Sequence, residues 1–80
     1  MNVLKLKIAT PEYVVYFYYP EDKGEPGEIR MNIPEEETIV VSHASGDNSA
    51  GHYAFKAAGA IKECVSKTQN IPIKFTNAWY

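Results

Sequence analysis

The stretch Tyr13-Val14-Val15-Tyr16-Phe17-Tyr18-Tyr19 decides the fold of this chain. Every residue in it is β-branched or aromatic, which is a composition typical of a β-strand. A strand with one solvent-exposed face alternates apolar and polar residues. In this stretch the side chains on both faces of the strand are apolar or aromatic. The stretch therefore predicts a central strand that packs on the core with one face and meets something else with the other.

The flanking segments also predict strands. Residues 3–9 alternate apolar side chains with lysines, and residues 28–33 alternate apolar with polar side chains, so each predicts a half-buried strand. Pro20 to Gly27 is a polar turn, and a fourth strand is predicted at 38–42. The side chains expected to face the core from these strands and the last one are Leu4, Leu6, Ile8, Ile29, Met31, Ile33, Ile73 and Phe75.

A helix is predicted from about Ser49 to Gln69, with Asp47 or Ser49 as its N-cap. Its apolar stripe at 100° per residue consists of Ala50, Ala54, Ala57, Ala58, Ile61, Cys64, Val65 and Thr68. A fifth strand follows over residues 71–76, and Pro72 favours an edge position because proline has no N–H for the ladder.

These elements predict an α+β fold in a single domain, residues 1–80. We expect an antiparallel five-stranded sheet (β-β-β-β-α-β) with one helix packed on one face. The preferred spatial order is 4-3-2-1-5. A right-handed parallel pairing of the fifth strand beside the fourth is the competing topology.

Composition limits the cellular setting. The chain has a formal net charge of −2, which gives no global electrostatic case for nucleic acid or an anionic membrane. The only cysteine, Cys64, excludes an intrachain disulfide, and its apolar neighbours predict a small buried side chain. Residues 3–8 alternate and do not form the apolar core of a signal peptide. We expect a cytoplasmic protein with no membrane partner.

The loop before the predicted helix contains the residues most suited to chemistry. Gly46 and Gly51 have the spacing of a phosphate loop, but His52-Tyr53 follow where the motif needs Lys and Ser or Thr. Structural zinc takes four Cys or His ligands, which this chain cannot supply. We therefore expect no enzyme activity, no metal and no cofactor. Free amides at the helix start make a small-ligand or anion loop the remaining possibility, with the candidate residues His43, Asp47, Ser49 and His52.

A second candidate surface is the sheet face opposite the helix. Half of the eight basic residues occupy its outward positions, namely Lys5, Lys7, Arg30 and Lys74. The central strand adds aromatic rings, either Tyr16 and Tyr18 or the set Tyr13, Phe17 and Tyr19, depending on register. Of the two aromatic sets we select the first, so the candidate interaction face consists of Tyr16, Tyr18, Lys5, Lys7, Arg30 and Lys74. Aromatic and basic side chains anchor protein interfaces and also stack bases of single-stranded nucleic acid, while a solvated sheet is the plain alternative.

Two aromatic residues outside the sheet carry separate expectations. Phe55 lies about 120° from the centre of the helix stripe, so it either tucks under the glutamate-rich loops or marks a second contact patch. Trp79, next to the terminal Tyr80, is expected to pack against the body or a neighbouring chain, because an unanchored tail frays.

Several short runs are specific as a signature: Tyr18-Tyr19-Pro20 with Gly24-Glu25-Pro26-Gly27-Glu28, then Gly51-His52-Tyr53-Ala54, and Ala78-Trp79-Tyr80. Through them the chain resembles a group of short uncharacterised bacterial proteins over nearly its whole length. The resemblance implies a bacterial cytoplasmic origin and says nothing about activity. The expected function is a small non-enzymatic interaction protein, homodimeric through the aromatic sheet face or an edge strand. The alternatives are a nucleic-acid binder and the 43–52 ligand loop.

Overall fold

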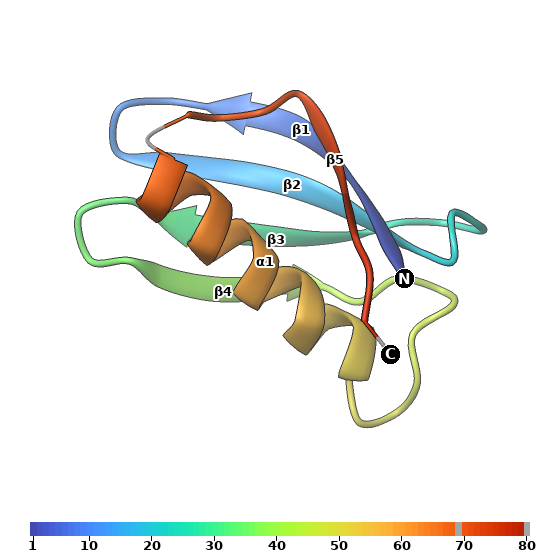
Figure 1. Ribbon diagram of the computed structural model, residues 1–80. Helices are drawn as coiled ribbons and strands as arrows, with labels where there is room; N and C mark the ends of the chain where they lie inside the picture. Colours follow the sequence, from blue (N-terminus) through green and yellow to red (C-terminus); the bar gives the residue numbers. More distant parts are fainter. Residues whose placement is uncertain (69, 80) are drawn as a thin grey trace.

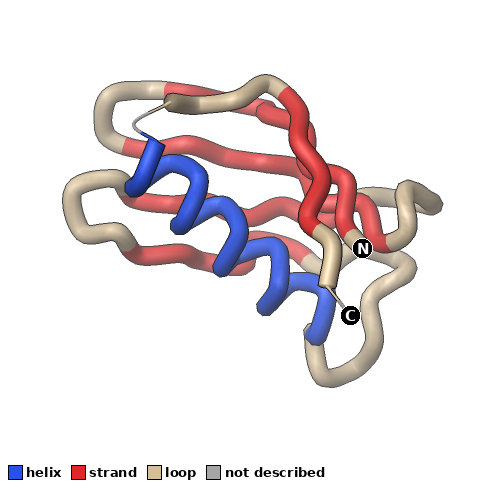
Figure 2. The backbone as a smooth tube through the Cα atoms, viewed as in Figure 1, coloured by secondary structure: helices blue, strands red, loops and turns tan. Residues whose placement is uncertain are grey.

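The computed structural model describes residues 1–68 and 70–79. It contains a sheet and a helix that runs obliquely across one face of it (Figures 1 and 2). The strands are β1 (Asn2–Ala9), β2 (Tyr13–Pro20), β3 (Gly27–Asn32), β4 (Glu37–Ser42) and β5 (Lys74–Asn77), and the helix is α1 (His52–Thr68). No helix in the described part of the chain is long and apolar enough to cross a membrane.

The strand order is β4-β3-β2-β1-β5, and every neighbouring pair is antiparallel. The predicted fold class and spatial order are confirmed, and the parallel alternative for the fifth strand is wrong. Because β4 and β5 form opposite edges, α1 carries the chain across the sheet from one edge to the other (Figure 1).

The register of β2 decides which of its faces the helix covers. Tyr16 pairs with Leu6 on β1 and Ile29 on β3, and Tyr18 pairs with Leu4 on β1. Both tyrosines are fully buried. They form the core with Leu4, Val14, Ile29, Met31 and Ala44 from the strands and loop, and with Ala54, Ala57, Ile61 and Val65 from α1. The alanines bring the helix close to the sheet, as the sequence predicts.

The helix begins at His52, three residues after the predicted start at Ser49. Gly51 has a φ of +69°, a left-handed conformation that does not belong to an α-helix, so the helix starts only after it. The predicted end at Gln69 and the side chain of Thr68 lie outside the described residues.

Ala50, predicted on the apolar stripe of the helix, is exposed because it precedes the helix. Two strand residues predicted to face the core are also exposed, and each has a local cause. A bulge in β1 between Leu6 and Ile8 shifts the register, so Ile8 pairs with Val15 on the face away from the helix. The last strand starts at Lys74, later than predicted, and Ile73 precedes it with 78% of its surface exposed. Upstream of that strand, the Tyr16 hydroxyl donates a hydrogen bond of 2.6 Å to the Pro72 carbonyl, which holds the incoming chain against the core.

Trp79 packs against the start of the helix, so the expectation that it is anchored is confirmed. Its ring lies 5.4 Å from the Tyr53 ring and 5.6 Å from the His52 ring, and the Lys56 ammonium lies 5.8 Å from it. The segment after β5 is thereby tied to the segment that opens α1. Tyr80 lies outside the described residues.

Gly27 generates the first prediction. It pairs with Tyr18, and a Cβ built there would collide with the Tyr18 ring and lie 2.6 Å from both the Ala44 nitrogen and the Ser42 oxygen. Gly27→Ala is expected to lower the free energy of unfolding by about 2–3 kcal/mol, because backbone atoms cannot move aside. Urea denaturation measures the loss.

Gly46→Ala is the matched control. Its added Cβ would make ordinary contact with Pro20 at 3.5 Å. The free energy of unfolding should then change by no more than about 0.5 kcal/mol. Equal losses for the two variants would contradict the account of Gly27.

Candidate interaction surfaces

The face of the sheet away from the helix carries the aromatic and basic side chains. Lys5 pairs with Phe17 on β2 and with Lys74 on β5, and Arg30 pairs with Val15. Tyr13, Phe17 and Tyr19 are half-buried on this face. The structure therefore selects the second of the two aromatic sets that the sequence allowed.

Tyr16 and Tyr18 do not belong to this face. The assignment of these two residues to the interaction surface is wrong, because the register turns both under the helix, where they are fully buried. The basic members of the set, Lys5, Lys7, Arg30 and Lys74, do lie on the uncovered strand face, with Arg30 half-buried.

The rings on this face are already covered by the cations beside them. The Lys5 ammonium lies 4.8 Å from the centre of the Tyr19 ring and that of Lys7 lies 5.4 Å from the Phe17 ring. The Arg30 guanidinium lies 3.9 Å from the Tyr13 ring. Each such contact contributes roughly 0.5–1 kcal/mol when exposed. Long side chains thus shield the second apolar face of β2 from water.

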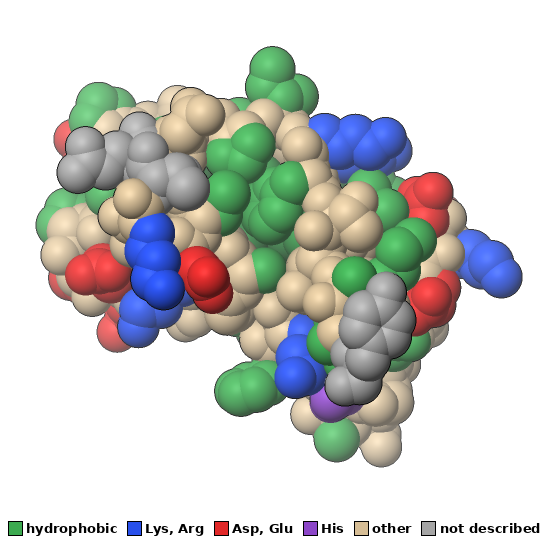
Figure 3. Space-filling view, in the orientation of Figure 1, with side chains coloured by type: hydrophobic (Ala, Val, Ile, Leu, Met, Phe, Trp, Pro, Cys, Tyr) green, Lys and Arg blue, Asp and Glu red, His purple; other side chains and the backbone are tan. Residues whose placement is uncertain are grey.

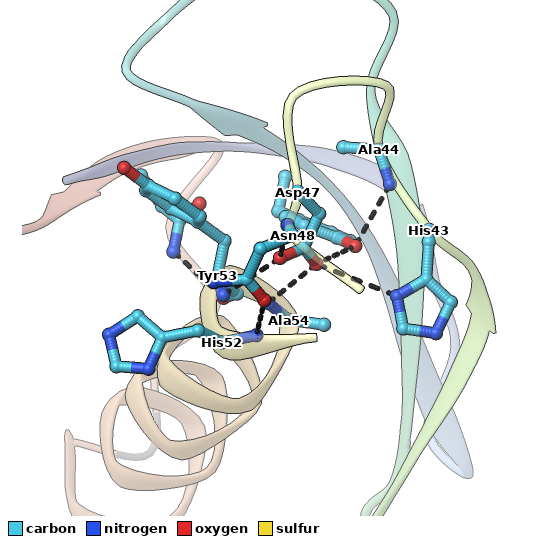
Figure 4. A network of polar contacts seen from close by, with 9 residues as sticks. His43, Ala44, Asp47, Asn48, His52, Tyr53 and Ala54 are labelled. Atoms are coloured by element: carbon cyan, nitrogen blue, oxygen red, sulfur yellow. Dashed lines mark hydrogen bonds and ion pairs between the residues drawn. The ribbon is translucent and has the colours of Figure 1, made fainter. Parts of the chain in front are cut away.

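The loop between β4 and α1 is organised by Asp47, whose side chain is only 1% exposed (Figure 4). Its carboxylate oxygens accept hydrogen bonds from the Tyr53 amide at 3.0 Å and the Ala54 amide at 3.1 Å. The same carboxylate accepts a bond of 2.8 Å from the Tyr18 hydroxyl. Asp47 therefore caps the helix from outside and ties it to β2. Of the two predicted caps, the structure uses Asp47.

Burial alone raises the pKa of Asp47. The hydrogen bonds from Tyr18, from the two helix amides and from His43 lower it further than burial raises it, so the net pKa lies below the ordinary aspartate value. Burial is also the main cause that raises the pKa of Tyr18 to about 12. Asp47 is thus an ionised acceptor and Tyr18 a neutral donor near neutral pH.

The candidate ligand loop is used by the protein itself. The amides of Tyr53 and Ala54 bind Asp47, and the His52 amide donates to the Asn48 side chain at 3.0 Å. The helix-start amides expected to hold an anion are therefore taken, which is a correction to that hypothesis. His43 Nδ1 lies 3.5 Å from Asp47, whereas the His52 ring points away from both (Figure 4).

Ser49 is exposed, and the amides at the helix start bind Asp47 and Asn48 instead. Among the residues that the structure describes, no group of three or more His, Cys, Asp or Glu side chains is placed to hold a metal ion. The expected set His43, Asp47, Ser49 and His52 is therefore brought to one loop but not to one converging site.

The helix side of the molecule has a hollow between α1 and β5, where hydrophobic side chains are visible in Figure 3. Its volume is about 480 Å³, and Ala60, Cys64 and Phe75 contribute to its walls. Cys64 is half-buried there, less enclosed than the sequence suggested. Glu63 and Lys67 lie at its rim, 3.8 Å apart.

The free edge of the sheet at β4 is the more exposed apolar feature. Ile39, Val40 and Val41 are 42%, 38% and 57% exposed. Ile39 pairs with Arg30 on the uncovered face and Val40 with Ile29 on the helix face, so apolar surface is exposed on both sides of this strand. Val41 has no direct partner on β3, because a bulge lies opposite Glu28 and Ile29.

Phe55 continues this surface onto the helix. It is 74% exposed, so it does not tuck under the glutamate-rich loops, and the second interpretation, a contact patch, fits its position. It borders a hollow of about 270 Å³ between α1 and β4, whose other lining residues are Thr38, Lys56, Ala58, Gly59 and Lys62.

The β4 edge was not among the residues selected from the sequence. The signal was nevertheless present: residues 37–42 contain three consecutive β-branched apolar residues and no lysine, arginine or proline. Together with the predicted order 4-3-2-1-5, that composition marks an unprotected edge.

Comparison with protein-family models, with curated proteins and with solved structures gives no significant match for this chain.

Asp47 generates the second prediction. Asp47→Ala removes the acceptor for two helix amides and a buried hydroxyl, and should cost about 1–2 kcal/mol of the free energy of unfolding at pH 7. Ser49→Ala is the control and should change it by less than about 0.5 kcal/mol. Denaturation curves of both variants measure the difference, and equal effects would contradict the assignment of the cap.

The lowered pKa of Asp47 determines how its contribution to the stability of the fold depends on pH. A group whose pKa is lower in the folded state stabilises the fold above its unfolded pKa, about 3.9 for aspartate. That contribution is lost as the pH falls through the folded pKa. The stability gap between the wild type and Asp47→Ala should therefore be constant from pH 7 to about 5 and shrink below about pH 4.

Proposed function

We propose that this chain is a non-enzymatic interaction protein of the bacterial cytoplasm that forms a homodimer through the free edge of β4. The observation that carries the proposal is the composition and exposure of that edge. Unpaired N–H and C=O groups on an edge strand can pair with another strand, and proteins usually block such edges with lysine, proline or a bulge. β4 has a charged residue at its start, Glu37, and a bulge at Val41, but residues 38–40 between them have none of these devices.

The opposite edge is protected by comparison. β5 has only four residues, carries Lys74 at its start and follows Pro72 closely. β4 has six residues and exposes Ile39, Val40 and Val41. The contrast between the two edges supports β4 as the contact.

A second copy is the simplest partner for this surface. An antiparallel pairing of β4 with itself would satisfy both edges at once and place the exposed side chains of each face beside those of the second copy. A domain of this size buries only about 60% of the surface its unfolded chain exposes, so added burial stabilises it appreciably.

The aromatic face of the sheet supports a partner less well. Its rings already lie against Lys5, Lys7 and Arg30, and Lys7 also binds Glu28 at 2.8 Å. Bases that stack on Tyr19, Phe17 or Tyr13 would have to displace these cations. The nucleic-acid alternative therefore remains a secondary hypothesis with weaker support.

The third prediction tests the β4 contact. Ile39→Lys places a charge on the exposed side of the edge and should weaken the dimer at least tenfold, an effect of about 1.4 kcal/mol. Sedimentation equilibrium over micromolar concentrations measures the dissociation constant. Lysine is well tolerated on edge strands, so the monomer should stay folded by circular dichroism.

Ile73→Lys is the matched control. Ile73 is 78% exposed, more than Ile39, but lies before β5 at the opposite edge. It should leave the dissociation constant unchanged. A wild-type monomer at tens of micromolar, or equal weakening by both lysines, would overturn the proposed function.

A further inference from the structure

We infer that the second copy is related by a two-fold axis that passes through the sheet plane beside Ile39, and that Phe55 of each copy fills the hollow beside Gly59 of the other. The two five-stranded sheets then form one continuous sheet, with both α1 helices antiparallel on the same face. This inference rests on the proposed homodimer and adds its geometry and its specific contact.

The Phe55 ring and the hollow beside Gly59 lie on the same side of the helix in one chain. The Phe55 ring projects from α1 with 74% of the residue exposed. A Cβ added to Gly59, one turn further along, would meet no heavy atom within 4 Å, so the surface beside it is open. A six-membered aromatic ring fits a cavity of roughly 150 Å³. The hollow of about 270 Å³ therefore has room for it.

The helix spacing is compatible with this contact. α1 makes most of its contacts with β3 and β4, so its central part lies near the free edge. Neighbouring strands are about 4.8 Å apart, so a helix centred between β3 and β4 lies about 5 Å from a two-fold axis at that edge. Two such helices lie about 10 Å apart, which is the distance of packed helices.

The spacing of Phe55 and Gly59 along the helix is compatible with a two-fold axis. Phe55 and Gly59 are four positions apart and occupy one helix face. For two antiparallel helices, an axis level with the midpoint between these residues brings each Phe55 opposite the other copy's Gly59. The hollow also touches Thr38, which adjoins Ile39, so the same axis falls near Ile39 on β4.

The oblique course of the helix favours a two-fold axis beside Ile39 rather than beside a later residue of β4. Figure 1 shows that α1 passes over β4 and that its N-terminal end reaches beyond the strand on the side of the β4–α1 loop. An axis near Val41 would make the two helices collide, whereas an axis near Ile39 leaves room for the Phe55 ring between them. In this register Val40 faces Thr38 of the second copy, and no like charges lie directly opposite on β4.

A dimer of standard size sets the area that this surface has to bury. A standard interface buries about 800 Å² per partner, roughly a sixth of the 4828 Å² of this chain. The proposed seam takes in the edge of a six-residue strand with its exposed Ile39, Val40 and Val41, together with the Phe55 side of a 17-residue helix. An aromatic anchor in a pocket at the centre is the usual source of affinity.

Cysteine cross-linking tests the axis. In a Cys64→Ala background, Ile39→Cys should form an intermolecular disulfide under mild oxidation. Residues directly opposite in an antiparallel pair have Cα atoms about 4.5–5.5 Å apart, within disulfide range. Val41→Cys should not cross-link, because its two copies would lie roughly 13 Å apart along the strands. A disulfide at residue 41 but not 39 would overturn the inference.

Two substitutions test the Phe55 ring and the hollow. Phe55→Ala removes the ring, and Gly59→Leu fills the hollow with a good helix former. Each should weaken the dimer at least tenfold in sedimentation equilibrium. Neither should destabilise the monomer, because Phe55 is exposed and the space beside Gly59 is open. The double variant Phe55→Ala/Gly59→Phe moves the ring to the other side of each contact and should recover part of the lost affinity.

The outcomes separate the two proposals. If the wild type dimerises and Ile39→Lys disrupts the dimer while Phe55→Ala and Gly59→Leu do not, the helix contact is wrong and the β4 dimer stands. If the wild type is monomeric, both are wrong. Weakening by all three substitutions, with the disulfide at residue 39, supports both.

Discussion

The carboxylate of Asp47 is the interaction on which the rest of the molecule depends. It joins the sheet through the Tyr18 hydroxyl and the helix through the Tyr53 and Ala54 amides. Together with the left-handed Gly51 before the helix, these contacts hold the first turn of α1 in one orientation against the sheet. Ala54 and Ala57 turn inward as a result, and Phe55 turns outward.

Hydrogen bonds of this kind explain the two buried tyrosines of β2. Tyr18 is fully buried, yet its hydroxyl accepts from the Ala44 amide at 2.9 Å and donates to Asp47. Tyr16 is also fully buried, and its hydroxyl donates to the Pro72 carbonyl. A buried hydroxyl without a partner would cost about 1–3 kcal/mol. Each tyrosine therefore fastens a loop to the core.

The fold could be predicted because it depends on periodicity. Alternation in the strands and the alanine stripe of the helix gave the elements and, with antiparallel meander rules, their order. The bulge before Ile8 and the start of β5 three residues later than predicted could not be foreseen, because neither changes the alternating composition of its segment. Which face of β2 is buried was ambiguous for a different reason: both alternating sets of its side chains are apolar or aromatic.

The candidate surfaces were predicted less well. The basic strand positions were located correctly, but pairing of each ring with a cation depends on side-chain geometry that spacing does not reveal. The helix-start amides looked available because a sequence does not show that Asp47 folds back over them. Ile39 and Val40 were predicted only as part of a fourth strand, and their place at the edge of the sheet exposes them.

The inequality of the two sheet edges has a consequence for assembly. Growth into a filament needs two different, complementary binding surfaces on each molecule. A single self-complementary surface is fully buried once two molecules have bound each other. In the proposed dimer, with β5 short and preceded by Pro72 and with β4 open, the sheet would double once and then stop. The exposed strand, an aggregation hazard in isolation, would then become the closed seam of a finite assembly.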